Sequence, residues 1–168
     1  RSAFGNDPGL TGCLLELEEM LKLKEGKQLE AACMELENGQ WVAYGDNSVR
    51  LPREEQVNIW NYLEAQSALR ATSSANSTWH MIELSSGFDV IDVALVDTSG
   101  EPTIYAIQIT CSIHPFRRPH TLHTCSGRSK ARLAKLWGVI CSELNISAPK
   151  IIYGMVAPNC VGDKYKAI

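Results

Sequence analysis

Apolar residues recur every three or four positions in three stretches of the first half of the chain, the spacing that gives an α-helix one apolar face. In residues 11–24 glutamates lie opposite a leucine face, and in residues 27–37 a second apolar stripe follows the interruption at Gly26. Residues 53–70 repeat the pattern, with Pro52 near the start, where proline suits the first turn of a helix. We therefore expect three helices before residue 71.

Short apolar runs typical of strands lie at four places: 40–44, 88–97, 103–110 and 150–157. In the third run the residues alternate, which predicts Ile104 and Ala106 on one face and Tyr105, Ile107 and Ile109 on the other. A Ser-Gly-Glu-Pro turn separates the second run from the third. These two runs are therefore predicted to form a β-hairpin.

The clearest helical pattern covers residues 128–144, where one stripe holds the large residues Leu133, Leu136, Trp137, Ile140, Cys141 and Leu144. The first half of this helix carries Arg128, Lys130, Arg132 and Lys135. Cations near a helix N-terminus oppose the helix dipole, so a phosphate partner would explain them. A solvated basic face is the alternative.

Helices mixed with strands predict an α/β fold with a mixed sheet.

Length and composition point to one folded domain. The chain has 168 residues, of which 45% are hydrophobic, enough to build a core. No apolar run approaches the roughly 18 residues of a membrane span, so no membrane partner is expected. Because the chain starts at Arg1 rather than Met, we expect it to belong to a longer protein.

The cysteines bear on the cellular compartment. All six are scattered without a Cys-x-x-Cys pair, which indicates reduced, mostly buried thiols and an intracellular location, with the nucleus as one option. An even number of cysteines keeps a secreted disulfide framework open as the alternative.

Charge is divided unevenly along the chain. Residues 1–101 carry 7 Lys/Arg and 17 Asp/Glu, whereas residues 102–168 carry 9 and 2, although the net charge is only −3. An acidic half followed by a basic half favours a surface that faces a polyanion, while solvated helix faces are the plainer interpretation.

Asp92 and the hairpin that follows it have the layout of a metal-dependent phosphodiesterase site. Such a site needs carboxylates that converge on Mg²⁺ and a nearby cation or base that activates water. Gln108 and Thr110 follow Asp92 across the predicted turn and share one face of the third run. Neither carries a charge, so these residues fit the layout in position and not in chemistry.

A series of short motifs extends over about residues 26–166: Gly26-x-x-x-Glu30, Leu36-x-x-Gly39, Phe88-x-x-x-Asp92, Ile107-Gln108-Ile109-Thr110, His114-Pro115, the basic helix and the final strand that leads to Ala157-Pro158. In order and spacing this series resembles the PD-(D/E)XK restriction-endonuclease-like domain, in the version found in Crinkler effectors and kinetoplastid retrotransposon hot spot proteins.

This resemblance implies an αβββαβ core and an origin in nucleic-acid cleavage. It gives Glu30 the place of the helix glutamate, Asp92 that of the strand aspartate, Gln108 that of the second acid and Thr110 that of the lysine. Glu30, Asp92 and Gln108 would then be the Mg²⁺ ligands. It also implies a domain at 26–168 after a linker and leader helix at 1–25. A P-loop NTPase domain often adjoins the family's domains, and one would lie outside this chain.

Residues 111–127 are predicted to form an irregular basic loop in which Arg117 and Arg118 contact nucleic acid together with the cations of the following helix. The loop region also contains potential zinc ligands, which keep a zinc-stabilised domain open as an alternative: Cys111, His114, His120, His123 and Cys125. His80 stands apart and is expected to be structural.

Two hypotheses of function follow. The first is a nuclease-like domain that binds DNA or RNA, in which cleavage is weak or lost because Gln108 and Thr110 replace acid and lysine; an Mg²⁺-dependent endonuclease is its enzymatic form. The second is a non-catalytic protein-interaction or effector module of a larger NTPase-containing protein. The salt dependence of DNA binding distinguishes them, because phosphate contacts weaken steeply as salt rises.

Overall fold

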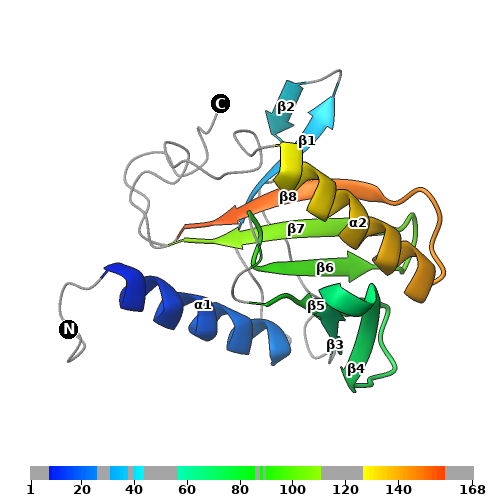
Figure 1. Cartoon of the computed structure of the whole chain (residues 1–168), viewed down its shortest axis with the longest axis horizontal. Coiled ribbons are helices and arrows are strands. Elements are labelled where there is room, and N and C mark those ends of the chain that lie inside the picture. The colour runs from blue at the N-terminus through cyan, green and yellow to red at the C-terminus, as the bar shows by residue number, and fades with distance from the viewer. Residues whose placement is uncertain are drawn as a thin grey trace.

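The computed structural model describes residues 8–25, 31–37, 40–43, 57–85, 88, 90–110 and 127–157. Two α-helices, a short 3₁₀ turn and eight strands make up this part of the chain (Figure 1). In chain order they are α1 (Pro8–Lys24), β1 (Ala32–Glu37), β2 (Gln40–Ala43), β3 (Asn58–Leu63), η1 (Glu64–Gln66), β4 (Ala68–Ser73), β5 (Trp79–Glu83), β6 (Val93–Asp97), β7 (Thr103–Ile109), α2 (Gly127–Glu143) and β8 (Lys150–Val156).

All eight strands belong to one mixed sheet with the order β2-β1-β8-β7-β6-β5-β3-β4. β5, β6 and β7 form an antiparallel meander, and α2 then carries the chain to β8, which lies beside β7 and runs parallel to it. The other parallel pair is β3 and β5. The sheet, with helices packed against it, confirms the predicted α/β class.

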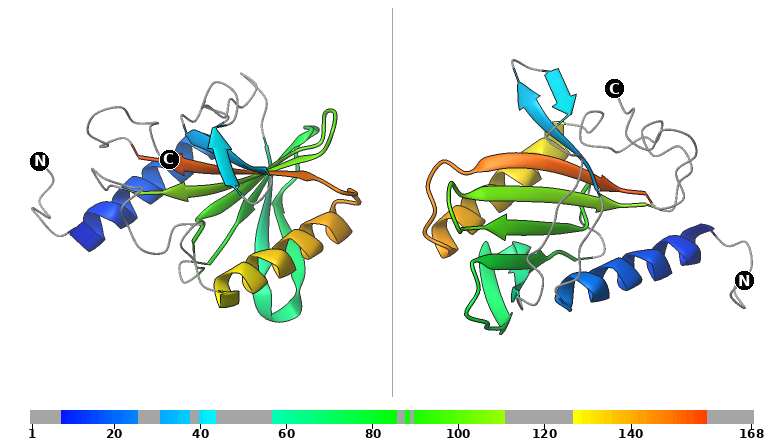
Figure 2. Two further views of the ribbon diagram at one scale, coloured as in Figure 1. Left: turned by 90° about the horizontal axis from the view of Figure 1, so that it is seen from above. Right: turned by 180° about the vertical axis from the view of Figure 1, so that it is seen from behind.

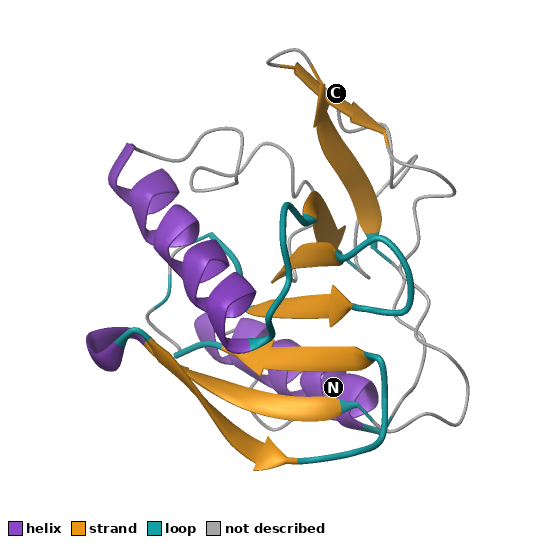
Figure 3. Ribbon diagram, turned by 90° about the vertical axis from the view of Figure 1, so that its right-hand side faces the viewer, coloured by secondary structure: helices purple, strands orange, loops and turns teal. Residues whose placement is uncertain are grey.

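The two helices cover opposite faces of the sheet (Figures 2 and 3). On the α2 face, Leu136 and Ile140 are fully buried against Ala106 of β7 and Tyr153 of β8. On the α1 face, Leu23 is fully buried in a second apolar cluster with residues of β6, β7 and β8. The helix predicted as a leader therefore shares a core with the strands of the sheet.

Several sequence predictions are confirmed. The helix predicted at 128–144 is α2, and the strands predicted at 40–44 and 150–157 are β2 and β8. The predicted hairpin is formed by β6 and β7, which pair in a regular antiparallel register between Val93 and Asp97. Ile104 and Ala106 face α2, whereas Ile107 and Ile109 face α1, as the alternation predicts.

The predicted helix at 27–37 is wrong where the structure describes it, because Ala32–Glu37 form β1. This strand pairs with β2 on one side and with β8 on the other, so its backbone groups are used by the sheet. The dipeptide between β1 and β2 is Asn38-Gly39, which is favoured in two-residue hairpins. The pairing of Glu37 with Gln40 shows that β1 and β2 form a hairpin.

The predicted helix at 53–70 is also wrong, since residues 58–73 form the β3–β4 hairpin around η1. Ser67 adopts a left-handed conformation with φ 49° and closes the hairpin. Asn58–Leu63 contains isoleucine, tryptophan and tyrosine, which favour strands, and β3 finds a second partner in β5. That partner, β5, lies outside every predicted strand, and β4 extends past the end of the predicted helix to Ser73.

Neither described helix is long and apolar enough to cross a membrane. Cys33 and Cys141 are free thiols. Burial raises the pKa of Cys33 to about 12, so this thiol is a small apolar core residue.

Candidate functional site

Asp92 lies directly before β6 and contacts the end of β7 through both its backbone and its side chain. Its N–H donates to the carbonyl oxygen of Ile107 at 2.8 Å, and its Oδ2 accepts from the N–H of Ile109 at 2.6 Å. These contacts fall on either side of Gln108, so the structure brings Asp92 and Gln108 together. The regular pairing of β6 with β7 ends at Val93 and Ile107, and beyond this pair the Asp92 carboxylate accepts the N–H that a backbone carbonyl would otherwise accept.

Gln108 is half-buried, and its side chain joins β7 to β8. Its Oε1 accepts a hydrogen bond of 2.5 Å from the hydroxyl of Tyr153. Tyr153 is fully buried in the cluster beneath α2, where a phenol needs a hydrogen-bond partner. The side chain at the predicted acid position therefore accepts the hydrogen bond of a buried tyrosine.

Thr110 follows the end of β7 and is only 3% exposed. Its N–H donates to the carbonyl oxygen of Val156 at 2.9 Å, which continues the pairing of β7 with β8. An ionised amine at such a buried position would carry a large desolvation cost. The local environment at the predicted lysine position therefore suits a small, neutral side chain.

The described residues around Asp92 supply fewer carboxylates than a Mg²⁺ site usually has. Magnesium in proteins is held mainly by carboxylates and water in near-octahedral geometry. Asp92 supplies one carboxylate that is bonded to a backbone N–H, Gln108 supplies an amide oxygen bonded to Tyr153, and Thr110 is buried. Across the described residues, no group of three His, Cys, Asp or Glu side chains is arranged to hold a metal.

Three predicted site residues, Glu30, Arg117 and Arg118, lie outside the described residues. The same is true of the potential zinc ligands Cys111, His114, His120, His123 and Cys125. The magnesium and zinc predictions that involve these side chains stay predictions.

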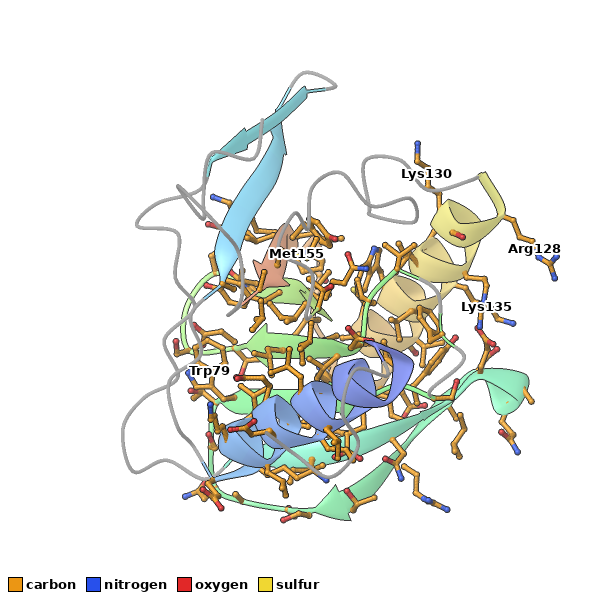
Figure 4. The ribbon with its side chains drawn as sticks, turned by 90° about the vertical axis from the view of Figure 1, so that its left-hand side faces the viewer. Trp79, Arg128, Lys130, Lys135 and Met155 are labelled. Atoms are coloured by element: carbon orange, nitrogen blue, oxygen red, sulfur yellow. The ribbon has the colours of Figure 1, made fainter. Side chains whose placement is uncertain are left out.

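The four cations predicted on α2 divide into two groups. Arg128, Arg132 and Lys135 are spaced by four and three residues, so they lie along one side of the helix. Lys130 projects in another direction from the first turns (Figure 4).

The same four cations also differ in exposure. Arg128, Lys130 and Lys135 are exposed, but Arg132 is partly buried and its Nη2 lies 2.8 Å from Oε1 of Glu64. The basic surface of α2 therefore has three exposed cations and one that is paired.

Sequence reasoning did not identify Tyr153 and Glu64 as partners of predicted site residues. Tyr153 lies within the apolar run of β8, and Glu64 looks like one more acid in an acidic half. No local pattern connects either residue with its partner, because 45 residues separate Tyr153 from Gln108 and 68 separate Arg132 from Glu64. His80, which was expected to be structural, accepts a hydrogen bond at its Nδ1 from Nε1–H of Trp60 at 3.1 Å.

Comparisons of the chain with protein-family models, with curated proteins and with solved structures each found no match.

Proposed function

We propose that this chain is a nucleic-acid-binding domain built on a nuclease-like core, in which phosphodiester cleavage is weak or lost. The hydrogen bond between Gln108 and Tyr153 is the observation that carries the second half of this proposal. A side chain that would be a metal ligand in an active nuclease is used instead to satisfy a core tyrosine.

The order of elements supports the nuclease-like core. The series β5, β6, β7, α2 and β8 follows the βββαβ part of the implied αβββαβ arrangement. Asp92 precedes the second of these strands, and Gln108 and Thr110 lie at the end of the third, in agreement with the resemblance.

The exposed cations of α2 support nucleic-acid binding. Arg128, Lys130 and Lys135 reach solvent (Figure 4), and the acidic residue of this helix, Glu143, lies at its far end. A positive helix surface attracts phosphates without reading sequence. Arg128 and Lys130 lie in the first turn of α2, where cations oppose the helix dipole and an anion would be favourable.

Fluorescence anisotropy with labelled DNA and RNA oligonucleotides tests the binding. We expect affinity to fall steeply between about 50 and 200 mM salt, because each phosphate contact contributes roughly −0.9 to the slope of log K against log salt. Lys135→Gln should weaken binding and flatten that slope. Lys22→Gln is the matched control, because it removes one partly exposed cation from α1 on the opposite face of the sheet. Binding that does not respond to salt would contradict the proposal.

Incubation of supercoiled plasmid with the protein and Mg²⁺ or Mn²⁺ tests the loss of cleavage. We expect no more cleavage by the wild type than by Asp92→Asn, which keeps a side-chain oxygen for Ile109 and loses the charge that a metal requires. Rapid cleavage by the wild type that disappears in Asp92→Asn would show that the catalytic site is intact.

The alternative is a non-catalytic protein-interaction or effector module, and a specific feature of α1 favours it. Leu14, Leu17 and Leu21 are 39%, 61% and 58% exposed and follow one side of the helix away from the sheet. A chain that binds no oligonucleotide at low salt would support this alternative.

A further inference from the structure

The guanidinium of Arg132 is held by residues from two other parts of the chain. Its Nε and Nη2 donate to Oε2 and Oε1 of Glu64 at 3.0 and 2.8 Å, a two-bond arrangement. Its Cζ also lies 4.6 Å from the centre of the Phe88 ring. The pair stays partly open to solvent, since the two side chains are 27% and 39% exposed.

A carboxylate bound in this way occupies the place that a phosphodiester could take. Arginine offers the same planar pair of donors to two carboxylate oxygens and to two phosphate oxygens. Because ion pairs near the surface are weak, one anion can exchange for the other at small cost. Phe88 would keep the guanidinium oriented after such an exchange, through its contact with the ring face.

Further cations lie on either side of Arg132. Arg128 is four residues before it and Lys135 is three residues after it, on the same side of α2, and both are exposed. A polyanion that contacts Arg128 and Lys135 therefore passes over Arg132 and meets the negative charge of Glu64 there.

A buried hydroxyl beside this cluster has no hydrogen-bond partner among the described residues. It is the Oη of Tyr62, a residue that is 6% exposed. The Tyr62 ring packs edge-on against Phe88, with the centroids 6.0 Å apart. The Phe88 ring is also the one over which the guanidinium of Arg132 lies. Burial raises the pKa of Tyr62. The charge of Glu64 raises this pKa further and the charge of Arg132 lowers it, so both charges act on the phenol. A neutral phenol here is a donor for which the described part of the chain supplies no acceptor, and a phosphate oxygen would be one.

We propose that Arg132, flanked by Arg128 and Lys135, is a phosphodiester-binding subsite that Glu64 occupies in the free protein and that nucleic acid enters by displacing Glu64. This inference rests on the proposed function. It adds a named ligand group, the backbone phosphate, and a residue that competes with it.

Glu64→Gln is the central variant, because glutamine keeps the shape of glutamate and removes its charge. We expect it to tighten the binding of a labelled single-stranded DNA oligonucleotide by about two- to fivefold, the strength of an exposed ion pair. Glu101→Gln is the matched control, since it removes the same charge from an exposed residue in the turn that joins β6 to β7. The gain in Glu64→Gln must exceed the gain in the control.

Arg132→Gln provides the second half of the test. In this background, the effect of Glu64→Gln should shrink to that of Glu101→Gln, because no arginine remains to be released. An equal gain with and without Arg132, or a gain no larger than the control, would overturn the subsite.

NMR of the wild-type protein supplies a measurement that needs no stable variant of Glu64. The Nε–Hε signal of Arg132, identified by its absence in Arg132→Gln, should shift as the oligonucleotide is added. An unshifted signal in a protein that binds the oligonucleotide would overturn the subsite and leave the proposed function intact. Failure of both the wild type and Glu64→Gln to bind would overturn both.

Discussion

The carboxylate of Asp92 accepts a 2.6 Å hydrogen bond from the backbone N–H of Ile109. This bond joins the start of β6 to the end of β7 at the place where the regular register between the two strands ends. A residue that only the sequence resemblance assigns as a metal ligand thus has a structural role in the fold.

Replacement of Asp92 by alanine should therefore destabilise the protein. The N–H of Ile109 would lose its acceptor, and an unsatisfied buried donor costs about 1–3 kcal/mol. Asp92→Asn should lose much less, because an amide oxygen can still accept the bond. Urea unfolding of the three proteins measures the difference. Equal losses in both variants would mean that this hydrogen bond is not what Asp92 contributes.

Gln108→Glu tests whether a metal site can be rebuilt. The variant places a second carboxylate beside Asp92, where the repulsion of two like charges should lower stability in the absence of metal. Mg²⁺ should then raise the melting temperature of Gln108→Glu and have little effect on the wild type. Gln108→Glu combined with Asp92→Asn is the control, since it has only one carboxylate. A Mg²⁺ response that persists in this double variant would place the ion elsewhere.

Two glycines should respond in opposite ways to substitution by alanine. Gly138 is exposed in the middle of α2, and a Cβ there would meet nothing within 4 Å. Gly138→Ala should therefore raise the free energy of unfolding by about 0.5–1 kcal/mol through the better helix propensity of alanine.

At Gly154 of β8, a Cβ would lie 2.6 Å from Cδ1 of Ile107 and 3.3 Å from the Cβ of Ala31. Both neighbours are fully buried, so Gly154→Ala should cost about 1–3 kcal/mol from overpacking. Urea unfolding compares the two variants. A neutral Gly154→Ala would show that Ile107 can move aside freely.

The stability of the protein should fall as the pH drops below about 6.5, in part because of His80. Burial lowers the pKa of His80, whose Nδ1 accepts the indole N–H of Trp60. Between this lowered pKa and the ordinary value of histidine, the unfolded chain binds more protons than the folded protein, so the free energy of unfolding decreases with decreasing pH. His80→Gln should remove this part of the dependence. An unchanged pH profile in the variant would assign the effect to other groups.

Local sequence was sufficient for α2 and for the β6–β7 hairpin. Leu133, Leu136 and Ile140 recur at helical spacing and are buried as a stripe, and the two strands of the hairpin meet through a short turn. In both cases the partners lie close together in the chain, so the pattern carries most of the information. The candidate site was predictable to the same extent, because Asp92 and Gln108 belong to this hairpin.

Tertiary structure decided the remaining elements and the chemistry of the site. Cys33 pairs with Gly154 and Asn58 pairs with His80, so β1 and β3 are strands because distant segments supply their partners. Local helical spacing in those stretches was overridden by backbone hydrogen bonds to a neighbouring strand on each side. The sequence alone determined which polar residues are candidates for the site and that two of them lack charge. Only the folded chain determined that Gln108 accepts a hydrogen bond from Tyr153 and that Glu64 pairs with Arg132. In each contact the two residues are far apart in the sequence and become neighbours only through the fold.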